Sequence, residues 1–201
     1  IALAGAINPI DHDAAHANLI AEQIVSNILR QVTSNEDKHT WMNISDVLPL
    51  LAEAAPDAFL SALEDDLDSD SPSISQLFQP ANDSLGLGPS SKQHYLLWSL
   101  ETLCWSREYL IRSIQILTRL SKYNLPNTSG NTPLRSMSTI LCGWFRNTSA
   151  DMQTRLQAIN ACHSIDPSIG LNLIKILWPN HHPVVIPSSS PCYRDWELNN
   201  K

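Results

Sequence analysis

Residues 94–120, HYLLWSLETLCWSREYLIRSIQILTRL, decide the fold class of this chain. The leucines in the first half of the stretch recur at steps of three and four residues, which places them on one face of an α-helix. Ser106 can begin a second helix, because a serine hydroxyl accepts a hydrogen bond from a backbone N–H of the first turn. Two amphipathic helices joined by so short a turn have to lie against each other. The stretch therefore predicts an antiparallel helical hairpin.

Similar signals predict further helices on both sides of this hairpin. We expect a long helix over residues 11–32. Pro56 should end one helix and begin the next, because proline lacks the N–H that the first helical turn leaves unpaired. Pro133 begins a third hairpin, with a second helix capped by Thr148 or Ser149, and Asp166 precedes a last helix. In the outer helices, the side chains that we expect to face the core are Leu19, Ile20, Ile24, Val25, Ile28 and Leu29 in the first helix, Leu134, Met137, Ile140, Leu141, Trp144 and Phe145 after Pro133, and Met152, Leu156, Ile159 and Cys162 in the helix that follows.

The chain is therefore predicted to be all-α. It has 201 residues with only 6 glycines, and its apolar segments keep helical spacing instead of strand alternation. Helix pairs with short internal turns and longer loops between them are typical of an irregular α-solenoid, and a compact irregular bundle is the alternative fold. We divide the chain into an N-terminal helix and linker (1–40), stacked helical hairpins (41–178) and a proline-rich extended arm (179–201).

The charge balance argues against nucleic acid as a partner. The net charge is −7, and the 13 lysines and arginines are scattered, whereas nucleic-acid-binding proteins gather basic residues into a patch. The same balance disfavours an anionic membrane surface, and no apolar run is long enough to cross a bilayer. The four cysteines form no CxxC pair, so we interpret them as small buried side chains in a reducing compartment and expect a cytoplasmic protein.

Patterns that would support catalysis or metal binding are missing from the sequence. His12 and His16 stand four residues apart, but the HExxH pattern of zinc enzymes is absent. His181 and His182 precede Cys192 at a spacing that matches no standard zinc site. We therefore expect no catalytic residue, no metal and no cofactor in this chain.

Binding of a protein partner is the function that we predict instead. An acidic run at a helix C-terminus opposes the helix dipole, which suggests that its charges serve to contact a basic partner or another domain. Tryptophan is enriched in interfaces, and two tryptophans flank expected surface loops. The candidate partner-binding residues are Trp41, Glu64, Asp65, Asp66, Asp68 and Trp196.

Two alternatives to this function stay open at the level of the sequence. The chain could be a helical enzyme domain with a pocket lined by His and Asp. In that case His94, His163 and a carboxylate should converge in one cleft. It could also be a purely structural spacer, which would expose neither an apolar patch nor a partner site.

Four segments together resemble a helical region of very large, mostly prokaryotic multidomain proteins. They are LPLLAEAAPDAFLSALEDDL (48–67), the stretch 94–120, NTPLRSMSTILCGWF (131–145) and PCYRDW (191–196). Such proteins carry an effector or signalling NTPase module elsewhere, and some are similar to antiviral STAND-type ATPases. The resemblance spans residues 41–197 and includes no catalytic residue. It implies a recognition or scaffolding segment of a defence or signalling protein, and the missing initiator Met likewise leads us to expect a piece of a longer chain.

Overall fold

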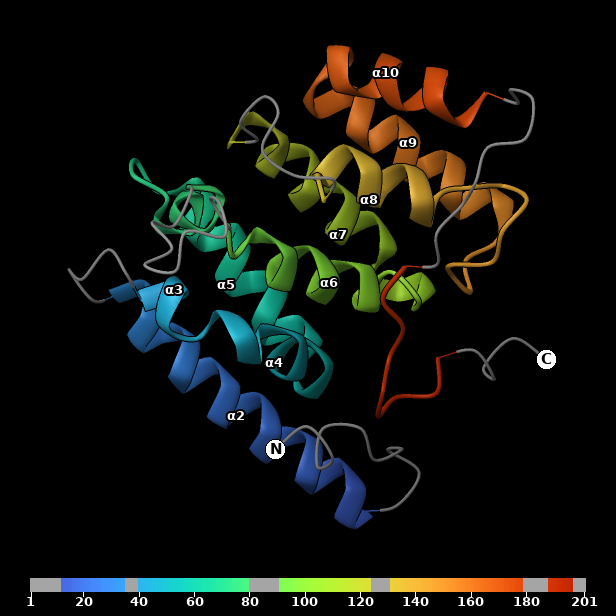
Figure 1. Cartoon of the computed structure of the whole chain (residues 1–201). Coiled ribbons are helices and arrows are strands. Elements are labelled where there is room, and N and C mark those ends of the chain that lie inside the picture. Colours follow the sequence, from blue (N-terminus) through green and yellow to red (C-terminus); the bar gives the residue numbers. More distant parts are fainter. Residues whose placement is uncertain (1–11, 35–39, 80–90, 124–130, 179–187, 197–201) are drawn as a thin grey trace, which may run out of the picture.

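The fold is all-α, as predicted. The computed structural model of the chain describes residues 12–34, 40–79, 91–123, 131–178 and 188–196, and every regular element in those ranges is a helix (Figure 1). In chain order the α-helices are α2 (His12–Ser34), α3 (Thr40–Asn43), α4 (Leu48–Ala54), α5 (Pro56–Asp68), α6 (Gln93–Leu103), α7 (Arg107–Leu120), α8 (Pro133–Ile140), α9 (Met152–Ile165) and α10 (Pro167–Leu177). Short 3-10 helices are η1 (Ser45–Val47), η2 (Ser73–Phe78) and η3 (Ser121–Tyr123).

The central stretch forms the two helices that its pattern predicts. The backbone leaves the helical conformation at Ser106, whose hydroxyl accepts a hydrogen bond from the N–H of Glu108 at 3.3 Å. The leucines of α6 and the apolar stripe of α7 are buried in one continuous core. Pro56 and Pro133 likewise stand in the first turns of α5 and α8, as predicted.

The helices pack in an order that runs from one end of the molecule to the other. α2 packs on α5, α4 packs on α6, and α7 contacts α5, α6, α8 and α9. α10 packs on α9 and α8. Figure 1 accordingly shows α2 and α10 at opposite ends, with α6 and α7 between them. One hydrophobic core extends from α2 to α10 through these contacts.

The buried face of α2 differs from the predicted one. Leu19, Ile20 and Ile24 are exposed, and the residues that face the core are Ala21, Val25, Leu29 and Val32. The helix is apolar over more than one face, and only the side that meets α4 and α5 can be buried. Of the predicted face, Val25 and Leu29 are buried and Ile28 packs against the core, so the prediction is confirmed for these residues and wrong for Leu19, Ile20 and Ile24.

The first helix of the predicted third hairpin is shorter than predicted, and it packs mainly on α6, α7 and α10 instead of on α9. α8 ends at Ile140, and Trp144 and Phe145 lie in an irregular connection, where both side chains are exposed. The buried side chain of Asn147 donates a hydrogen bond to the carbonyl oxygen of Thr139 at 2.9 Å, which satisfies a backbone group near the end of α8. The connection is therefore held by its own polar contacts, and it does not continue the helix.

The start and the buried face of α9 also differ from the prediction. Asp151, and neither Thr148 nor Ser149, caps the helix by accepting a hydrogen bond from the N–H of Thr154 at 2.8 Å. Met152 and Leu156 are exposed. α9 buries Thr154, Ala158 and Cys162, of which Cys162 was predicted, and the predicted Ile159 packs against the core as a partly buried residue.

Candidate functional site

The acidic run that we predicted as a contact for a basic partner is largely engaged within the chain. The carboxylate of Glu64 accepts two hydrogen bonds from the guanidinium of Arg112, at 3.0 and 2.8 Å. Asp68 is paired with Arg119. Both contacts join α5 to α7, so these charges stabilise the packing of two helices.

Asp66 has a structural role of a different kind. It is buried, and one of its carboxylate oxygens accepts hydrogen bonds from the backbone N–H of Ser73 at 3.2 Å and from its hydroxyl at 2.6 Å. The other oxygen accepts from the N–H of Ile74 at 2.9 Å. Asp66 thereby holds η2 against the end of α5, and a buried carboxylate that is already satisfied is not available to a partner.

Asp65, an exposed member of the acidic run, lies at a surface hollow between α2 and α5. The hollow has a volume of about 390 Å³, and its lining includes Glu22, Asp57 and Arg30. Burial raises the pKa of the Glu22 carboxyl, although a hydrogen bond from the N–H of Ala58 acts in the opposite direction. An external cation could therefore still approach Asp65, and also the exposed side of Asp68, which is paired with Arg119.

The two predicted tryptophans are placed differently from each other. Trp41 is completely buried in the core, so the prediction that it contacts a partner is wrong: a side chain at the start of a domain can fold inward under a loop. Trp196 is partly buried. Its ring lies at 6.1 Å from that of Tyr109, and the guanidinium of Arg194 lies at 5.8 Å from the same indole.

Trp196 belongs to a segment that crosses the helices without regular structure. We name residues 188–196 the strap. It is drawn in red in Figure 1. The rest of the predicted arm, including His181 and His182, lies outside the described residues.

The strap is held by a carboxylate at the C-terminal end of α4. Glu53 is only 3% exposed, and it accepts hydrogen bonds from the backbone N–H groups of Cys192 at 3.0 Å, of Arg194 at 2.7 Å and of Tyr193 between them. Successive N–H groups that converge on one buried carboxylate satisfy an anion that would otherwise be costly to remove from water.

The guanidinium of Arg194 completes this end of α4. Its Nε donates to the carbonyl oxygen of Glu53 at 2.6 Å, and its Nη2 donates to that of Ala54 at 2.9 Å. Carbonyl groups in the last turn of a helix have no partner within the helix, and a cation is favoured there by the helix dipole. Burial lowers the pKa of Arg194, while the surrounding acidic groups favour its charged form.

A second carboxylate holds the beginning of the strap. Glu101 of α6 accepts hydrogen bonds from the hydroxyl of Ser136 at 2.6 Å and from the N–H of Ser189 at 2.9 Å. The indole N–H of Trp105 donates to the carbonyl oxygen of Ser189 at 2.8 Å. We call the surface formed by Glu53, Glu101, Trp105 and Tyr109 the strap groove.

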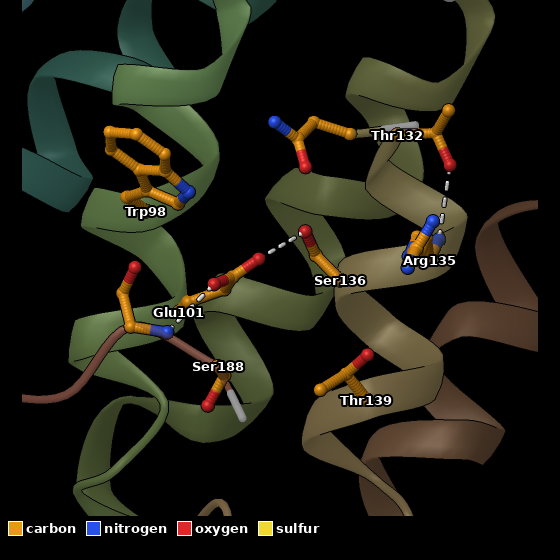
Figure 2. Close-up of a pocket in the computed structure, with 9 residues that line it drawn as sticks. Trp98, Glu101, Thr132, Arg135, Ser136, Thr139 and Ser188 are labelled. Atoms are coloured by element: carbon orange, nitrogen blue, oxygen red, sulfur yellow. Dashed lines mark hydrogen bonds between the residues drawn. The ribbon is translucent and has the colours of Figure 1, made fainter. Parts of the chain in front are cut away.

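A small polar pocket adjoins the strap groove between α6 and α8. Its volume is about 150 Å³, and Figure 2 shows Glu101 and Ser136 joined across it, with Trp98 on one side and Arg135 on the other. Both oxygens of Glu101 accept hydrogen bonds from within the chain. The carboxylate therefore positions the strap and joins α6 to α8 through Ser136.

The histidines of the enzyme alternative do not line this pocket or the hollow beside α2. His94 contacts the rings of Tyr95 and Trp98, and His163 is exposed on α9. In the part of the chain that the structure describes, no group of three or more His, Cys, Asp or Glu side chains is placed to hold a metal ion. No described helix is long and apolar enough to span a membrane.

Sequence reasoning did not identify the strap groove, although one signal pointed to it. Glu53 interrupts the apolar run around Pro56, and a charged residue inside such a run needs a partner when it is buried. Its partner lies more than a hundred residues away in Cys192–Arg194, so no local pattern could name it. Comparisons with protein-family models, with curated proteins and with solved structures find no match.

Proposed function

We propose that this chain is a segment of an α-solenoid and that it binds protein partners without catalysing a reaction. The observation that carries this proposal is the presence of apolar surface on the outermost helix at each end of the molecule. At α10, the exposed fraction is 51% for Leu171 and 69% for Trp178, the residue directly after the helix, and Ile174 is exposed as well. On α2, Leu19 is 62% exposed, next to Ile20 and Ile24.

The spacing of apolar residues along α10 supports a position between two layers. Ile169, Leu173 and Leu177 recur every four residues and pack against the core. Leu171, Ile174 and Trp178 follow steps of three and four on another side of the helix. A surface helix normally presents polar residues to water, and a helix that is apolar on more than one side is typical of a buried layer.

We infer that the occupant of each end face is a further helix of the parent protein with an apolar face of its own. Terminal repeats of a helical array need a polar outer face for solubility, whereas the outer surfaces of α2 and α10 include large exposed apolar side chains among their polar ones. Burying one Leu, Ile or Trp side chain stabilises a complex by about 1.5–3 kcal/mol, so three such residues form a substantial contact.

This proposal places the partner contact on the apolar end faces, whereas the sequence led us to expect it at the acidic run. Glu64, Asp66 and Asp68 are used within the chain, so attraction of a basic partner is left to Asp65 and the hollow beside α2. The resemblance to helical regions of large prokaryotic proteins supports the same proposal, and a role in antiviral defence is part of it. No group in the described residues favours the enzyme alternative.

The experiment compares the self-association of the chain with that of a variant whose α10 face is polar. We expect the 201-residue chain to associate at micromolar concentrations in sedimentation velocity and to bind a hydrophobic dye. The variant Leu171→Asn, Ile174→Asn, Trp178→Gln should sediment as a monomer with an unchanged thermal unfolding midpoint. A matched control, Asn172→Ala with Lys175→Ala, alters exposed polar residues of the same helix. A chain that is monomeric and binds no dye would contradict the proposal.

A further inference from the structure

We propose that the strap groove is an exchangeable peptide-binding site. Its ligand class is an extended peptide with the sequence Arg-x-Trp, and the occupant in this structure is the chain's own strap, residues 188–196. This site is separate from the apolar end faces, because its contacts come from α4, α6 and α7 and are largely hydrogen bonds.

The main contacts of the groove are directed at the backbone of its occupant. Glu53 accepts N–H groups of consecutive residues, and Glu101 accepts the N–H of Ser189. Trp105 donates to the carbonyl oxygen of that same residue. Contacts of this kind recognise an extended chain whatever its side chains are, in the way that β-augmentation sites recognise peptide backbones.

Two side chains of the strap add sequence specificity. The guanidinium of Arg194 reaches the last carbonyl oxygens of α4 through two separate N–H donors. The planar fork of arginine has the geometry for such a double contact, whereas lysine presents a single point charge. Trp196 places its indole edge-to-face with Tyr109, with ring centroids 6.1 Å apart. Because both residues come from the strap, Arg-x-Trp is the part of the ligand that the groove selects.

The strap is a separable occupant, because it adds little to the hydrophobic core. The fully buried apolar residues of the described chain all belong to the helices and their connections, and Trp196 contributes one partly buried side chain. When the strap leaves, Glu53 and Trp105 become accessible to water, which replaces the lost hydrogen bonds. The helices should therefore remain folded around an open groove.

Exchange is limited by the covalent connection of the strap to the same chain. A tethered ligand competes at an effective concentration of about millimolar, so a free peptide at micromolar concentration hardly displaces it. A strap that has lost its specific side chains should compete poorly. In the variant Arg194→Ala, Trp196→Ala the strap keeps only its backbone contacts, so a free peptide can displace it without any truncation of the chain.

The experiment measures binding of a fluorescein-labelled peptide to the 201-residue chain by anisotropy. The peptide is the strap sequence SSSPCYRDW, with Cys192→Ser to prevent disulfide formation. We expect saturable binding to the Arg194→Ala, Trp196→Ala variant that is at least about tenfold tighter than to the unaltered chain. The same peptide with its Arg and Trp replaced by Ala keeps only the backbone contacts and should bind at least about tenfold more weakly.

Two further variants test whether binding occurs in the groove. Adding Glu53→Ala to the strap variant should abolish peptide binding. The matched control, Asp65→Ala on the same strap variant, removes an exposed carboxylate outside the groove and should leave binding unchanged. Circular dichroism accompanies each measurement. Loss of helical structure in the strap variant would overturn the proposal, because the strap would then be part of the fold. A folded variant that does not bind, or that binds a scrambled peptide equally well, would also overturn it.

Discussion

The helix pairs α6–α7 and α9–α10 are built on the same plan and differ in their surroundings. In each pair a polar side chain caps the second helix directly after the break: Ser106 before α7 and Asp166 before α10. The inner pair is enclosed by α4, α5, α8 and α9, so that most of its apolar side chains are buried. The outer pair packs on α7 and α8 and leaves apolar side chains of α10 in solvent.

An amphipathic pattern indicates both that a segment forms a helix and that one face of the helix is buried. The difference between the two pairs shows that these properties have separate causes. Formation of a helix depends on residues close in the chain, through caps, prolines and spacing. Burial of a helix face depends on which neighbours cover it. The same type of substitution should therefore have very different costs in the two pairs.

The largest contrast is expected for leucines on the second helix of each pair. Leu110→Ala removes a completely buried side chain from α7 and should lower the free energy of unfolding by about 2–5 kcal/mol. Leu171→Ala on α10 removes an exposed side chain and should change it by less than about 0.5 kcal/mol. Urea unfolding followed by circular dichroism gives both values. Similar losses in the two variants would show that the outer face of α10 is not open in solution.

A second contrast concerns the two described glycines of the outer region. An added Cβ at Gly170 would lie 2.6 Å from the Cα of His163, so α9 and α10 would have to separate. At Gly143 the nearest atom is the flexible end of Met152, at 4.0 Å. Gly170→Ala should destabilise the chain by about 1–3 kcal/mol despite the better helix propensity of alanine, because a backbone atom cannot give way.

Gly143→Ala serves as the matched control and should be neutral within about 0.5 kcal/mol. The thermal unfolding midpoint distinguishes the two variants. If Gly170→Ala were as stable as the unaltered chain, the close approach of α9 and α10 would be wrong.

Helix boundaries could be predicted from the sequence where a local signal sets them. Pro56, Ser106 and Asp166 each act on backbone groups within three residues, and each marks a helix start in the structure. The face of α7 was also predictable, because its polar residues leave a single apolar stripe. On α2 and α9 apolar residues occupy several sides, so the buried side depends on packing partners that the sequence does not name.

The candidate site was less predictable, because its contacts are long-range. Glu64 and Asp68 looked like unused charges until α7 supplied Arg112 and Arg119. Trp41 looked accessible because polar segments flank it, yet it is buried. The strap contacts of Glu53 join distant parts of the chain, and a single sequence contains no pattern that pairs them.

Substitution of the capping residues Ser106 and Asp166 tests the comparison between the inner and the outer helix pair through a few hydrogen bonds. Ser106→Ala should lower the free energy of unfolding of the whole chain by about 1 kcal/mol, because α7 lies at the centre of the core. Asp166→Ala removes the acceptor for the N–H groups of Ser168 and Ile169 and should loosen α10 alone. Amide hydrogen exchange distinguishes the two outcomes. Equal loss of protection in α6 and α10 after Asp166→Ala would mean that the outer pair is as strongly coupled to the core as the inner one.

The smallest effect is expected for Tyr109→Phe, which should change the melting temperature little at neutral pH and more under alkaline conditions. Burial raises the pKa of Tyr109, and the negative charge of Asp57 acts in the same direction. The folded chain therefore keeps the phenol protonated above about pH 10, where an unfolded tyrosine ionises. Fewer protons are then bound in the unfolded state, so stability falls as the pH rises through this range. Tyr109→Phe has no proton to lose, so its melting temperature should fall less between pH 9 and 11 than that of the unaltered chain.

At pH 7 the two proteins should differ little in melting temperature, because the hydroxyl of Tyr109 makes only a long contact of 3.4 Å with Asp57. Parallel decline of the two proteins above pH 10 would place Tyr109 in solvent and would remove it from the wall of the strap groove.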